Sequence, residues 1–452
     1  MTLTRYTAGS FRELCTIALP LMLSALSVTS MFFVDRLFIA QYATDALTAT
    51  VNASTQGWVF IAVWMVLCGM SEVFVAQYNG AKEKEFLGHP VWQMIWVSLL
   101  STLFFVPLAY TGPLFFGEGI YENTYFFWIV SFGASYALYA SVAGFFIGQG
   151  KTLLVTLLAV VTNIFNAVFD WILIFGMEGW FPEMGVKGAA IATTISSLFQ
   201  FLVLFAIFLN KKNRTECGTS AWQWNSELMW KCLKVGVPSA ILVFAEVEAW
   251  AMFYAMMTQM GHTYITIVGI AQSMVIFLYF FADGLYKAAT TLVGNYIGAG
   301  RLDLIPKVMQ ACLKLNLLFL AVMMGAFLLW YDSIVNLFLP GTDPAFIAHI
   351  ENALHFVFFC DLIYLFFEGL RMQYIAQLTA AGDTVFTSVA GISCVWLFLV
   401  LPIYYCFLVL GLPVEAAGLI IVGYSFLATG VYYFRYLQGA WKDIHLLDKE
   451  LS

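Results

Sequence analysis

The chain has 452 residues, of which 62% are hydrophobic and only 10% are charged, and its mean hydropathy is +0.86. Because a soluble domain carries roughly 25% charged residues, this composition excludes an ordinary soluble protein and indicates an integral membrane protein. The net charge of −7 gives no reason to expect a nucleic-acid partner.

Continuously apolar stretches recur along the whole chain. A helix needs about 20 apolar residues to cross the hydrocarbon core, whereas a membrane β-barrel shows segments of about 10 residues with alternating polarity. No short cleavable leader precedes the first stretch, so we expect that helix to remain in the membrane. We predict an all-α integral membrane protein with twelve transmembrane helices, near residues 14–42, 50–77, 91–112, 121–146, 153–175, 187–209, 234–258, 267–295, 308–330, 345–377, 384–408 and 415–437.

The basic residues predict how these helices are oriented. An even number of helices places both termini on one side. Of the 20 Lys and Arg residues, nearly all lie in the termini or in loops after even-numbered helices. The opposite loops hold only Lys187, and Arg36, Lys287 and Arg371 fall inside helices. Because cytoplasmic loops are enriched in Lys and Arg, we expect a multi-pass protein of the cell membrane with both termini in the cytoplasm.

The two halves of the chain repeat one another. Pro20 in "IALPLMLSAL" and Pro238 in "VGVPSAILVF" are 218 residues apart, and the same offset places "QYNGA" (77–81) on "NYIGA" (295–299). Farther along, "GQGKT" (148–152) matches "AAGDT" (380–384) with an offset of 232. We therefore predict two parallel-repeat six-helix lobes, an N-terminal lobe over 1–209 and a C-terminal lobe over 232–452, joined by a cytoplasmic linker over 210–231. A duplicated bundle with a site between its halves is typical of transporters that work by alternating access.

Polar residues inside the N-terminal lobe form a candidate ion site. Asp35 lies deep in the first predicted helix, and Asn166 and Asp170 share one face of the fifth because they are four residues apart. Arg36, the only base nearby, points about 100° away from Asp35 on a helix. An intramembrane acid is costly, and two carboxylates in one desolvated site hold a proton or bind a hard cation. With Thr193 completing an oxygen cage, we expect coupling to Na⁺ or H⁺.

In the C-terminal lobe the acids have bases close to them. Asp283 and Lys287 are spaced i, i+4, and Glu368 and Arg371 are spaced i, i+3. Residues at these spacings are neighbours on a helix surface, so each pair is expected to neutralise itself. Glu246, in the seventh helix, has no base at such a spacing.

The tenth predicted helix carries a polar stripe. Asp361, Tyr364, Glu368 and Arg371 follow at i, i+3, i+7 and i+10, so they must face protein or water rather than lipid. Glu246 and Glu368 are the candidates for a cation-coupling site in this lobe. Candidate modulators of the two sites are Arg36, Asp283, Lys287, Asp361 and Arg371.

Signals for catalysis are missing from the sequence. It has five His but no HExxH, and it has no GxSxG and no P-loop, so we expect no enzyme, no cofactor and no direct use of ATP. The eight cysteines are scattered without metal-binding spacing, and we expect buried small apolar residues there. No metal site other than one for Na⁺ is predicted.

The segments that hold these residues resemble the multidrug and toxic compound extrusion (MATE) transporters. The resemblance rests on their order over nearly the whole chain: "ALPLMLSALSVTSMFFVDRLFIAQYATDALTA", "VAQYNGAKEKEFLG", "GQGKT", "NIFNAVFDWILIFG", "GVKGAAIATTIS", "VGVPSAILVFAEVE", "LVGNYIGAGR" and "QLTAAGDT". It implies twelve helices in two lobes and secondary antiport, in which Na⁺ or H⁺ enters while an organic compound leaves.

The resemblance also assigns residues. Asp35 matches the family's acid in helix 1, Asn166 and Asp170 match its pair in helix 5, and Thr193 matches a Thr of helix 6. Glu246, eight residues after Pro238, matches an acid of helix 7, and Glu368, fifteen residues before Asp383, matches an acid of helix 10 in one branch. Arg36, Lys287 and Arg371 depart from the family pattern.

These observations lead to one main functional expectation and three alternatives. We expect a cation-coupled antiporter that exports organic, amphiphilic cations, working as a monomer in the lipid bilayer. The alternatives are an exporter of one physiological metabolite, which the internal bases would allow to be anionic, a flippase for a lipid-linked precursor, and, from another class, a membrane-embedded enzyme. The sequence leaves the coupling ion and the coupling lobe open.

Overall fold

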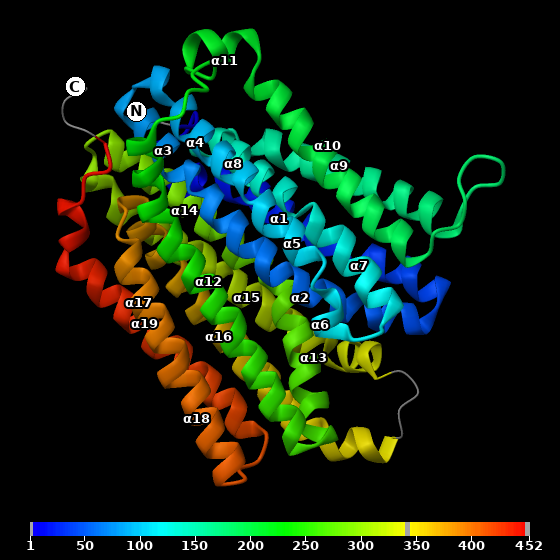
Figure 1. Ribbon diagram of the computed structural model, residues 1–452. Helices are drawn as coiled ribbons and strands as arrows, with labels where there is room; N and C mark the ends of the chain where they lie inside the picture. Colours follow the sequence, from blue (N-terminus) through cyan, green and yellow to red (C-terminus); the bar gives the residue numbers. More distant parts are fainter. Residues whose placement is uncertain (1–2, 340–343, 448–452) are drawn as a thin grey trace.

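The computed structural model describes residues 3–339 and 344–447, and nearly all of this part is helical (Figure 1). Twelve segments within it are long and apolar enough to cross a membrane. The described residues hold no β-structure beyond one isolated bridge between Met177 and Phe181. The prediction of an all-α protein with twelve spans is confirmed.

The first half begins with a capped helix. The Ser10 side chain accepts a hydrogen bond from the backbone N–H of Glu13 at 3.2 Å, which satisfies one free donor of the first turn. Pro20 lies inside this helix. The helices of this half are α1 (Phe11–Tyr42), α2 (Thr44–Gly69), α3 (Ser71–Ala81), α4 (Gly88–Leu100), α5 (Thr102–Ala109), α6 (Gly112–Phe116), α7 (Ile120–Ser131), α8 (Gly133–Gly148), α9 (Thr152–Phe175) and α10 (Val186–Phe208), with a 3₁₀ turn η1 (Lys84–Phe86).

The second half repeats the order of the spans, but its third and fourth spans are single helices and its fifth is interrupted. Its helices are α12 (Ser226–Met260), α13 (His262–Leu278), α14 (Phe280–Gly298), α15 (Ile305–Phe338), α16 (Pro344–Ala381), α17 (Thr384–Val395), α18 (Leu401–Ile403) and α19 (Glu415–Gln438), with 3₁₀ turns η2 (Leu302–Leu304) and η5 (Ala440–Asp443). On both sides of α18 the chain is π-helical, in η3 (Trp396–Val400) and η4 (Tyr404–Val409). Pro402 lies between them and has no N–H for the helix ladder.

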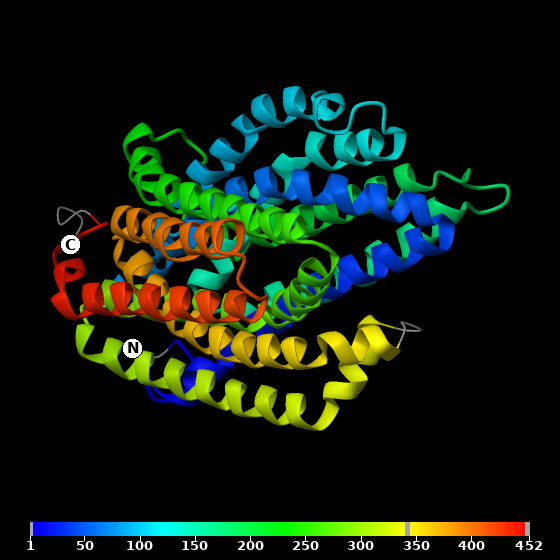
Figure 2. The ribbon, with the colours of Figure 1, turned by 90° about the horizontal axis from the view of Figure 1, so that it is seen from below.

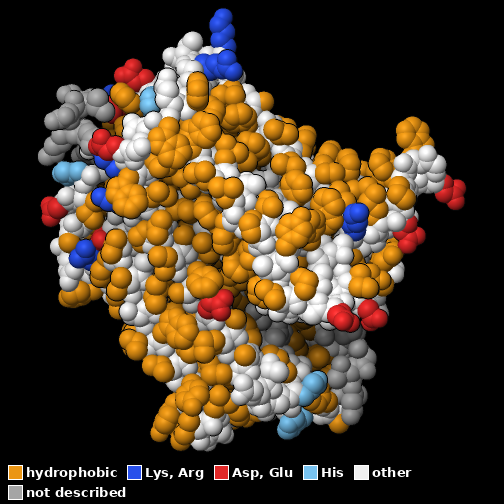
Figure 3. All heavy atoms as spheres, in the orientation of Figure 1, with side chains coloured by type: hydrophobic (Ala, Val, Ile, Leu, Met, Phe, Trp, Pro, Cys, Tyr) orange, Lys and Arg blue, Asp and Glu red, His pale blue; other side chains and the backbone are white. Residues whose placement is uncertain are grey.

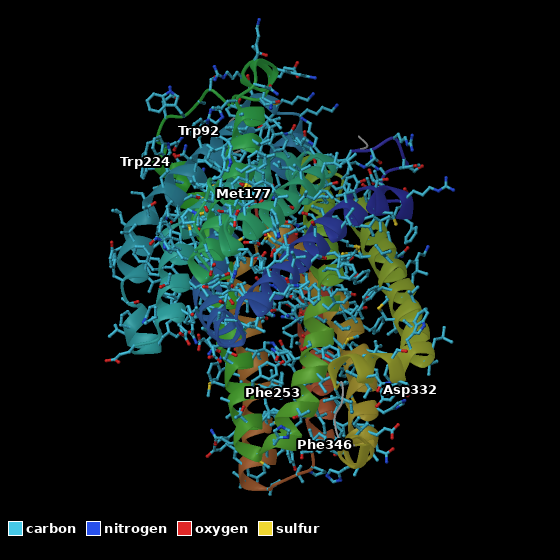
Figure 4. All side chains as sticks on the ribbon, turned by 90° about the vertical axis from the view of Figure 1, so that its right-hand side faces the viewer. Trp92, Met177, Trp224, Phe253, Asp332 and Phe346 are labelled. Atoms are coloured by element: carbon cyan, nitrogen blue, oxygen red, sulfur yellow. The ribbon has the colours of Figure 1, made fainter. Side chains whose placement is uncertain are left out.

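The linker between the halves is partly helical and is bonded to α4. The predicted linker, 210–231, contains α11 (Lys211–Glu216) and the first turn and a half of α12, whose N-cap is Asn225. Side chains of α4 hold it in place, since the indole nitrogen of Trp92 donates to the Thr219 carbonyl at 2.9 Å and Gln93 bonds the backbone of Gln223 and Asn225 at 3.0 and 2.9 Å. Figure 4 shows Trp92 and Trp224 toward one end of the molecule, far from Phe346.

The two halves form separate bundles that meet near the chain termini. Figure 1 shows the halves side by side at the end that holds both termini and diverging toward the other end, and Figure 2 shows the blue-to-cyan helices of the first half opposite the yellow-to-red helices of the second. The main contacts across the halves join α1 with α14, α2 with α12, and α3 with α14. Apolar side chains cover most of the face in Figure 3, as expected of a surface that faces lipid.

One contact between the halves uses the repeated sequences themselves. The side-chain amide of Gln77 donates to the Ala380 carbonyl at 2.7 Å, and that of Asn295 donates to the Gly148 carbonyl at 2.8 Å. The offsets of 218 and 232 relate Gln77 to Asn295 and Gly148 to Ala380, so the two hydrogen bonds are copies of one another. A further bond joins the Asn79 and Asn295 side chains directly, at 2.7 Å.

Two glycines allow the backbones to approach at this contact. A Cβ atom on Gly80 would lie 2.0 Å from the Asn295 carbonyl oxygen, and one on Gly298 would lie 1.9 Å from the Gln77 carbonyl oxygen. Both distances are far inside van der Waals contact, so only glycine fits either position. Gly80 and Gly298 are themselves related by the offset of 218. We call this contact, formed by Gln77, Gly80, Gly148, Asn295, Gly298 and Ala380, the inter-lobe seal.

Candidate functional site

The structure brings the four predicted residues of the N-terminal lobe together. Asp35 comes from α1, Asn166 and Asp170 from α9, and Thr193 from α10, and α9 packs against both of the other helices. All four side chains are buried, with exposed fractions of 0 to 4%. Asp35, which lies at least 131 positions before the other three residues in the sequence, thus shares one small volume with them inside the lobe.

Asn166 bridges the two acids. With its amide nitrogen turned toward them, that nitrogen lies 2.8 Å from Oδ1 of Asp35 and 3.3 Å from Oδ2 of Asp170. The Asp35 carboxylate also lies near Asp170 and the Thr193 hydroxyl, which donates to the Ala189 carbonyl at 3.0 Å. Oδ2 of Asp35 and Oδ1 of Asp170 are buried and have no hydrogen-bond partner among the residues that the structure describes. A buried acceptor without a partner is costly, so two oxygens here are available to a proton or a cation.

Sequence reasoning missed the hydroxyl groups around this site. Tyr136, on α8, is 9% exposed, and its hydroxyl lacks a hydrogen-bond partner. Ser135 and Ser197 bond each other at 2.7 Å, and the Ser197 side chain also lies near the Tyr136 hydroxyl. Only the repeat pointed to Tyr136, because the offset of 232 places it at the position of Glu368 in the other lobe.

Arg36 does not pair with Asp35. Its residue is exposed while Asp35 is buried, and within the described residues it forms no ion pair. This agrees with the angle of about 100° between neighbours on a helix. The Asp35–Asn166–Asp170 group therefore contains two acids and no base.

The predicted acids of the C-terminal lobe are joined by an arginine. Arg371 makes two bonds to Glu368, Nε to Oε2 at 2.8 Å and Nη2 to Oε1 at 2.7 Å, and its Nη1 donates to Oε1 of Glu246 at 2.7 Å. The Glu368 and Arg371 side chains are 1% and 4% exposed. The i, i+3 spacing predicted the first pair, but nothing in the sequence predicted the bond to Glu246, 125 residues away. The group has two acids and one base, and every guanidinium nitrogen donates to a carboxylate.

A second polar group lies where α14 meets α3. Lys287 Nζ is 2.8 Å from Oδ2 of Asp283, the i, i+4 pair that the sequence predicted. Glu72 on α3 accepts a hydrogen bond from Thr291 at 2.9 Å and lies within electrostatic range of Lys287. Sequence reasoning did not identify Glu72 as a candidate residue, because no base stands three or four positions from it in the sequence. The Asp283 and Lys287 side chains are 33% and 40% exposed, so this pair stays accessible.

Asp361 stands apart from both groups. It is buried on α16 at 6% exposure, its Oδ2 atom has no hydrogen-bond partner, and it lines a small cavity. The predicted polar stripe therefore divides into an ion-paired part, Glu368 and Arg371, and an unpaired acid, Asp361.

Comparison with known proteins agrees with this architecture. The model of the MatE family matches residues 20–172 and 238–406, one match in each half of the chain. The chain belongs to the MatE family. It is thus a multi-pass membrane transporter and not an enzyme, and the family resemblance in its sequence segments is confirmed.

Bacterial relatives carry names of drug-resistance proteins. The "Probable multidrug resistance protein NorM" of Thermotoga maritima is 25% identical over 407 residues, which cover 85% of this chain and 83% of that protein. The "Probable multidrug resistance protein YoeA" of Bacillus subtilis is 24% identical over 408 residues, covering 85% and 84%.

Solved structures share the fold. A MOP superfamily transporter from Pyrococcus furiosus superposes with a TM-score of 0.85 at 17% identity, covering 96% of this chain and 97% of that one, and its structure is described as having a binding pocket of reversed polarity. A multidrug resistance MATE transporter in an outward-facing conformation gives a TM-score of 0.84 at 16% identity, covering 95% and 96%. At these identities the likeness establishes the fold alone.

Proposed function

We propose that this protein is a multidrug efflux antiporter of the cell membrane, which exports organic amphiphilic cations in exchange for Na⁺ or H⁺. Both termini lie in the cytoplasm, as the distribution of Lys and Arg favours. The names of the bacterial relatives support drug efflux.

The observation that carries the coupling is the Asp35–Asn166–Asp170 group. It buries two carboxylates with no base among them, and one oxygen of each lacks a partner. Two like charges in a site of low dielectric are stable only with a proton or a bound cation between or beside them. Oxygens from Asp35, Asp170 and Thr193 are ligands that suit a hard cation such as Na⁺. The site is thus suited to exchange one small cation in each transport cycle.

The C-terminal lobe is less suited to this role. Glu246 and Glu368 are the other candidate acids, but Arg371 already donates to both. A coupling cation would have to displace a guanidinium that makes three charge-assisted hydrogen bonds, which are among the strongest in proteins. We therefore assign coupling to the N-terminal lobe and a structural role to the Glu246–Arg371–Glu368 group.

Charge also favours a cationic substrate over an anionic one. Of the three bases inside helices, Lys287 and Arg371 are each paired with acids, and Arg36 is exposed. A lipid-linked precursor with phosphate groups would need free bases at its binding site, and within the described part of the chain Lys287 and Arg371 are occupied. An anionic metabolite is the second candidate, which Lys287 supports through its accessible position.

The test is dye efflux driven by an imposed gradient. Inverted membrane vesicles are prepared with the wild type, Asp35→Asn or Glu246→Gln. A Na⁺ gradient or a pH gradient is imposed across the vesicle membrane, and the movement of ethidium is followed by fluorescence. We expect one gradient to drive transport in the wild type and Asp35→Asn to abolish it. Glu246→Gln should retain the coupling but lose stability.

Two results would contradict the proposal. If neither gradient drives movement of any cation in the wild type, the protein is not a cation-coupled exporter. If Asp35→Asn transports as well as the wild type, the coupling site lies elsewhere.

A further inference from the structure

A small cavity in the C-terminal lobe encloses the unpaired acid Asp361. Its volume is about 20 Å³, and its lining comes from α12, α13, α16 and α19. A site of that size holds about one water-sized particle. Phe253, one of its lining residues, lies between Trp92 and Phe346 in the view of Figure 4, on the side of Phe346.

Four aromatic rings form part of the wall around this acid. Trp250, Phe253, Tyr254 and Tyr364 all line the cavity. The Trp250 ring lies 6.0 Å from that of Tyr364 in an edge contact and 6.3 Å from that of Tyr254 in a stacked one, so these rings support one another. Phe253 and Tyr364 are buried, whereas Trp250 and Tyr254 keep partial exposure, so the cavity is not sealed on that side.

The acid has no counter-charge. Asp361 is 6% exposed, its Oδ2 atom has no hydrogen-bond partner, and among the described residues it forms no ion pair. Arg371, ten residues along α16, gives its nitrogens to Glu246 and Glu368. An uncompensated carboxylate in an apolar wall is costly, and a cation that enters the cavity would remove that cost.

The wall selects the kind of cation. Na⁺ needs several oxygen ligands, but the side chains lining the cavity offer few oxygens besides Asp361, namely those of Gln272, Tyr254 and Tyr364. Organic ammonium groups are bound by aromatic rings together with a carboxylate. A primary ammonium also has N–H groups to donate to the unpartnered Oδ2 of Asp361, and a trimethylammonium has none.

We propose that Asp361, with Trp250, Tyr254 and Tyr364, forms a subsite for the primary ammonium group of a substrate. This assignment rests on the proposed export of organic cations and narrows the substrate class to amphiphiles with a primary amine. The apolar part of the substrate lies outside the cavity, beyond the partly exposed Trp250 and Tyr254.

Binding can be tested without transport. The purified wild type, Asp361→Asn and Trp250→Leu are titrated with n-octylammonium, octyltrimethylammonium and neutral 1-octanol, and the shift in Tm is recorded. Asp332→Asn, an exposed acid at the outer end of the same lobe, is the matched control. We expect octylammonium to stabilise the wild type and the control more than octyltrimethylammonium does, and its apparent affinity to fall about tenfold or more in both cavity variants.

The outcomes separate this subsite from the transport function. Equal stabilisation of Asp361→Asn and the wild type by octylammonium overturns the subsite, and so does a trimethylammonium shift equal to the primary one. If Asp361→Asn does not fold, an unchanged affinity of Trp250→Leu for octylammonium overturns the subsite instead. The loss of octylammonium binding in the variants supports the subsite even where gradient-driven efflux is not observed, since failed efflux contradicts only the antiport.

Discussion

Thr193 distinguishes the two coupling ions at the scale of a single residue. Its hydroxyl lies beside the Asp35 carboxylate and is bonded to the Ala189 carbonyl. A Na⁺ ion would use this oxygen as a ligand, whereas a proton needs only the carboxylates. The side chain is therefore important for one ion and dispensable for the other.

Replacing Thr193 by Val should reveal which ion is used. The change keeps the shape and removes the oxygen. If Na⁺ is coupled, we expect Thr193→Val to need about tenfold more Na⁺ for half-maximal efflux, which corresponds to about 1.4 kcal/mol. Thr194→Val is the control, because Thr194 is equally buried and bonds the Ala190 carbonyl at 2.9 Å. Unchanged Na⁺ dependence in both variants excludes Thr193 as a ligand.

We expect Arg371 to contribute to the stability of the folded protein. Replacing it by Met leaves the buried Glu368 and the partly buried Glu246 without this partner, and breaking a buried pair in this way costs about 3–5 kcal/mol. We expect a lower Tm for Arg371→Met and its recovery when Glu246→Gln and Glu368→Gln are added. Arg301→Met, which removes an exposed pair with Asp303, should leave Tm unchanged. A fall in Tm that the added Gln residues do not reverse would contradict the electrostatic explanation.

At the scale of whole helices, the linker is held by its contacts with α4. Gln93 donates to the Gln223 carbonyl and accepts from the Asn225 N–H. Gln93→Leu removes both bonds next to the start of α12. We expect faster cleavage of residues 217–225 in limited proteolysis and little change in Tm. Gln149→Leu is the control, since Gln149 bonds only its own helix and Lys151. Equal cleavage rates in the two variants would show that α4 does not hold the linker.

Hydropathy predicted the spans, but not where the helices break or how far they extend. The second span was expected at 50–77 and runs from Asp45 to Ala81. The helix continues at both ends into polar residues, which hydropathy does not count as part of the span. The breaks at Met70 and Tyr279 have α-helical backbone angles. Gly69 precedes the first break, but no Gly or Pro stands beside the second. Pro402 was visible, yet the π-helical turns around it depend on packing within the lobe.

The candidate sites show the same division between local and long-range information. Spacing on one helix predicted that Asn166 and Asp170 share a face and that Glu368 meets Arg371, and the structure confirms both placements. The bond from Arg371 to Glu246 joins separate helices and could not be read from periodicity. The repeat was informative in another way. The offset of 218 makes Phe253 the equivalent of Asp35 in the second half, so the acid is present in one half and not in the other.

For the whole molecule, the inter-lobe seal holds the two halves together. Both of its amide-to-carbonyl bonds join opposite halves, and the offset relates them as copies. A rocking motion of one lobe against the other must break both bonds together, because a rigid lobe cannot open one while keeping its copy. The proposed transport by alternating access therefore predicts two states of the seal, bonded and broken.

A bulky residue in the seal should hold that end open. Val at Gly298 would place its Cβ 1.9 Å from the Gln77 carbonyl oxygen, and backbone cannot move aside as a side chain can. Spin labels at the exposed positions Lys84 and Arg301, on opposite halves, report the opening in a cysteine-free background. We expect Gly298→Val to lengthen the distance between the labels and to slow efflux. Gly430→Val, where a Cβ meets open space, should behave as the wild type. A label distance that stays the same in Gly298→Val would mean that the seal does not control this end, and the two copied hydrogen bonds would then only stabilise the fold.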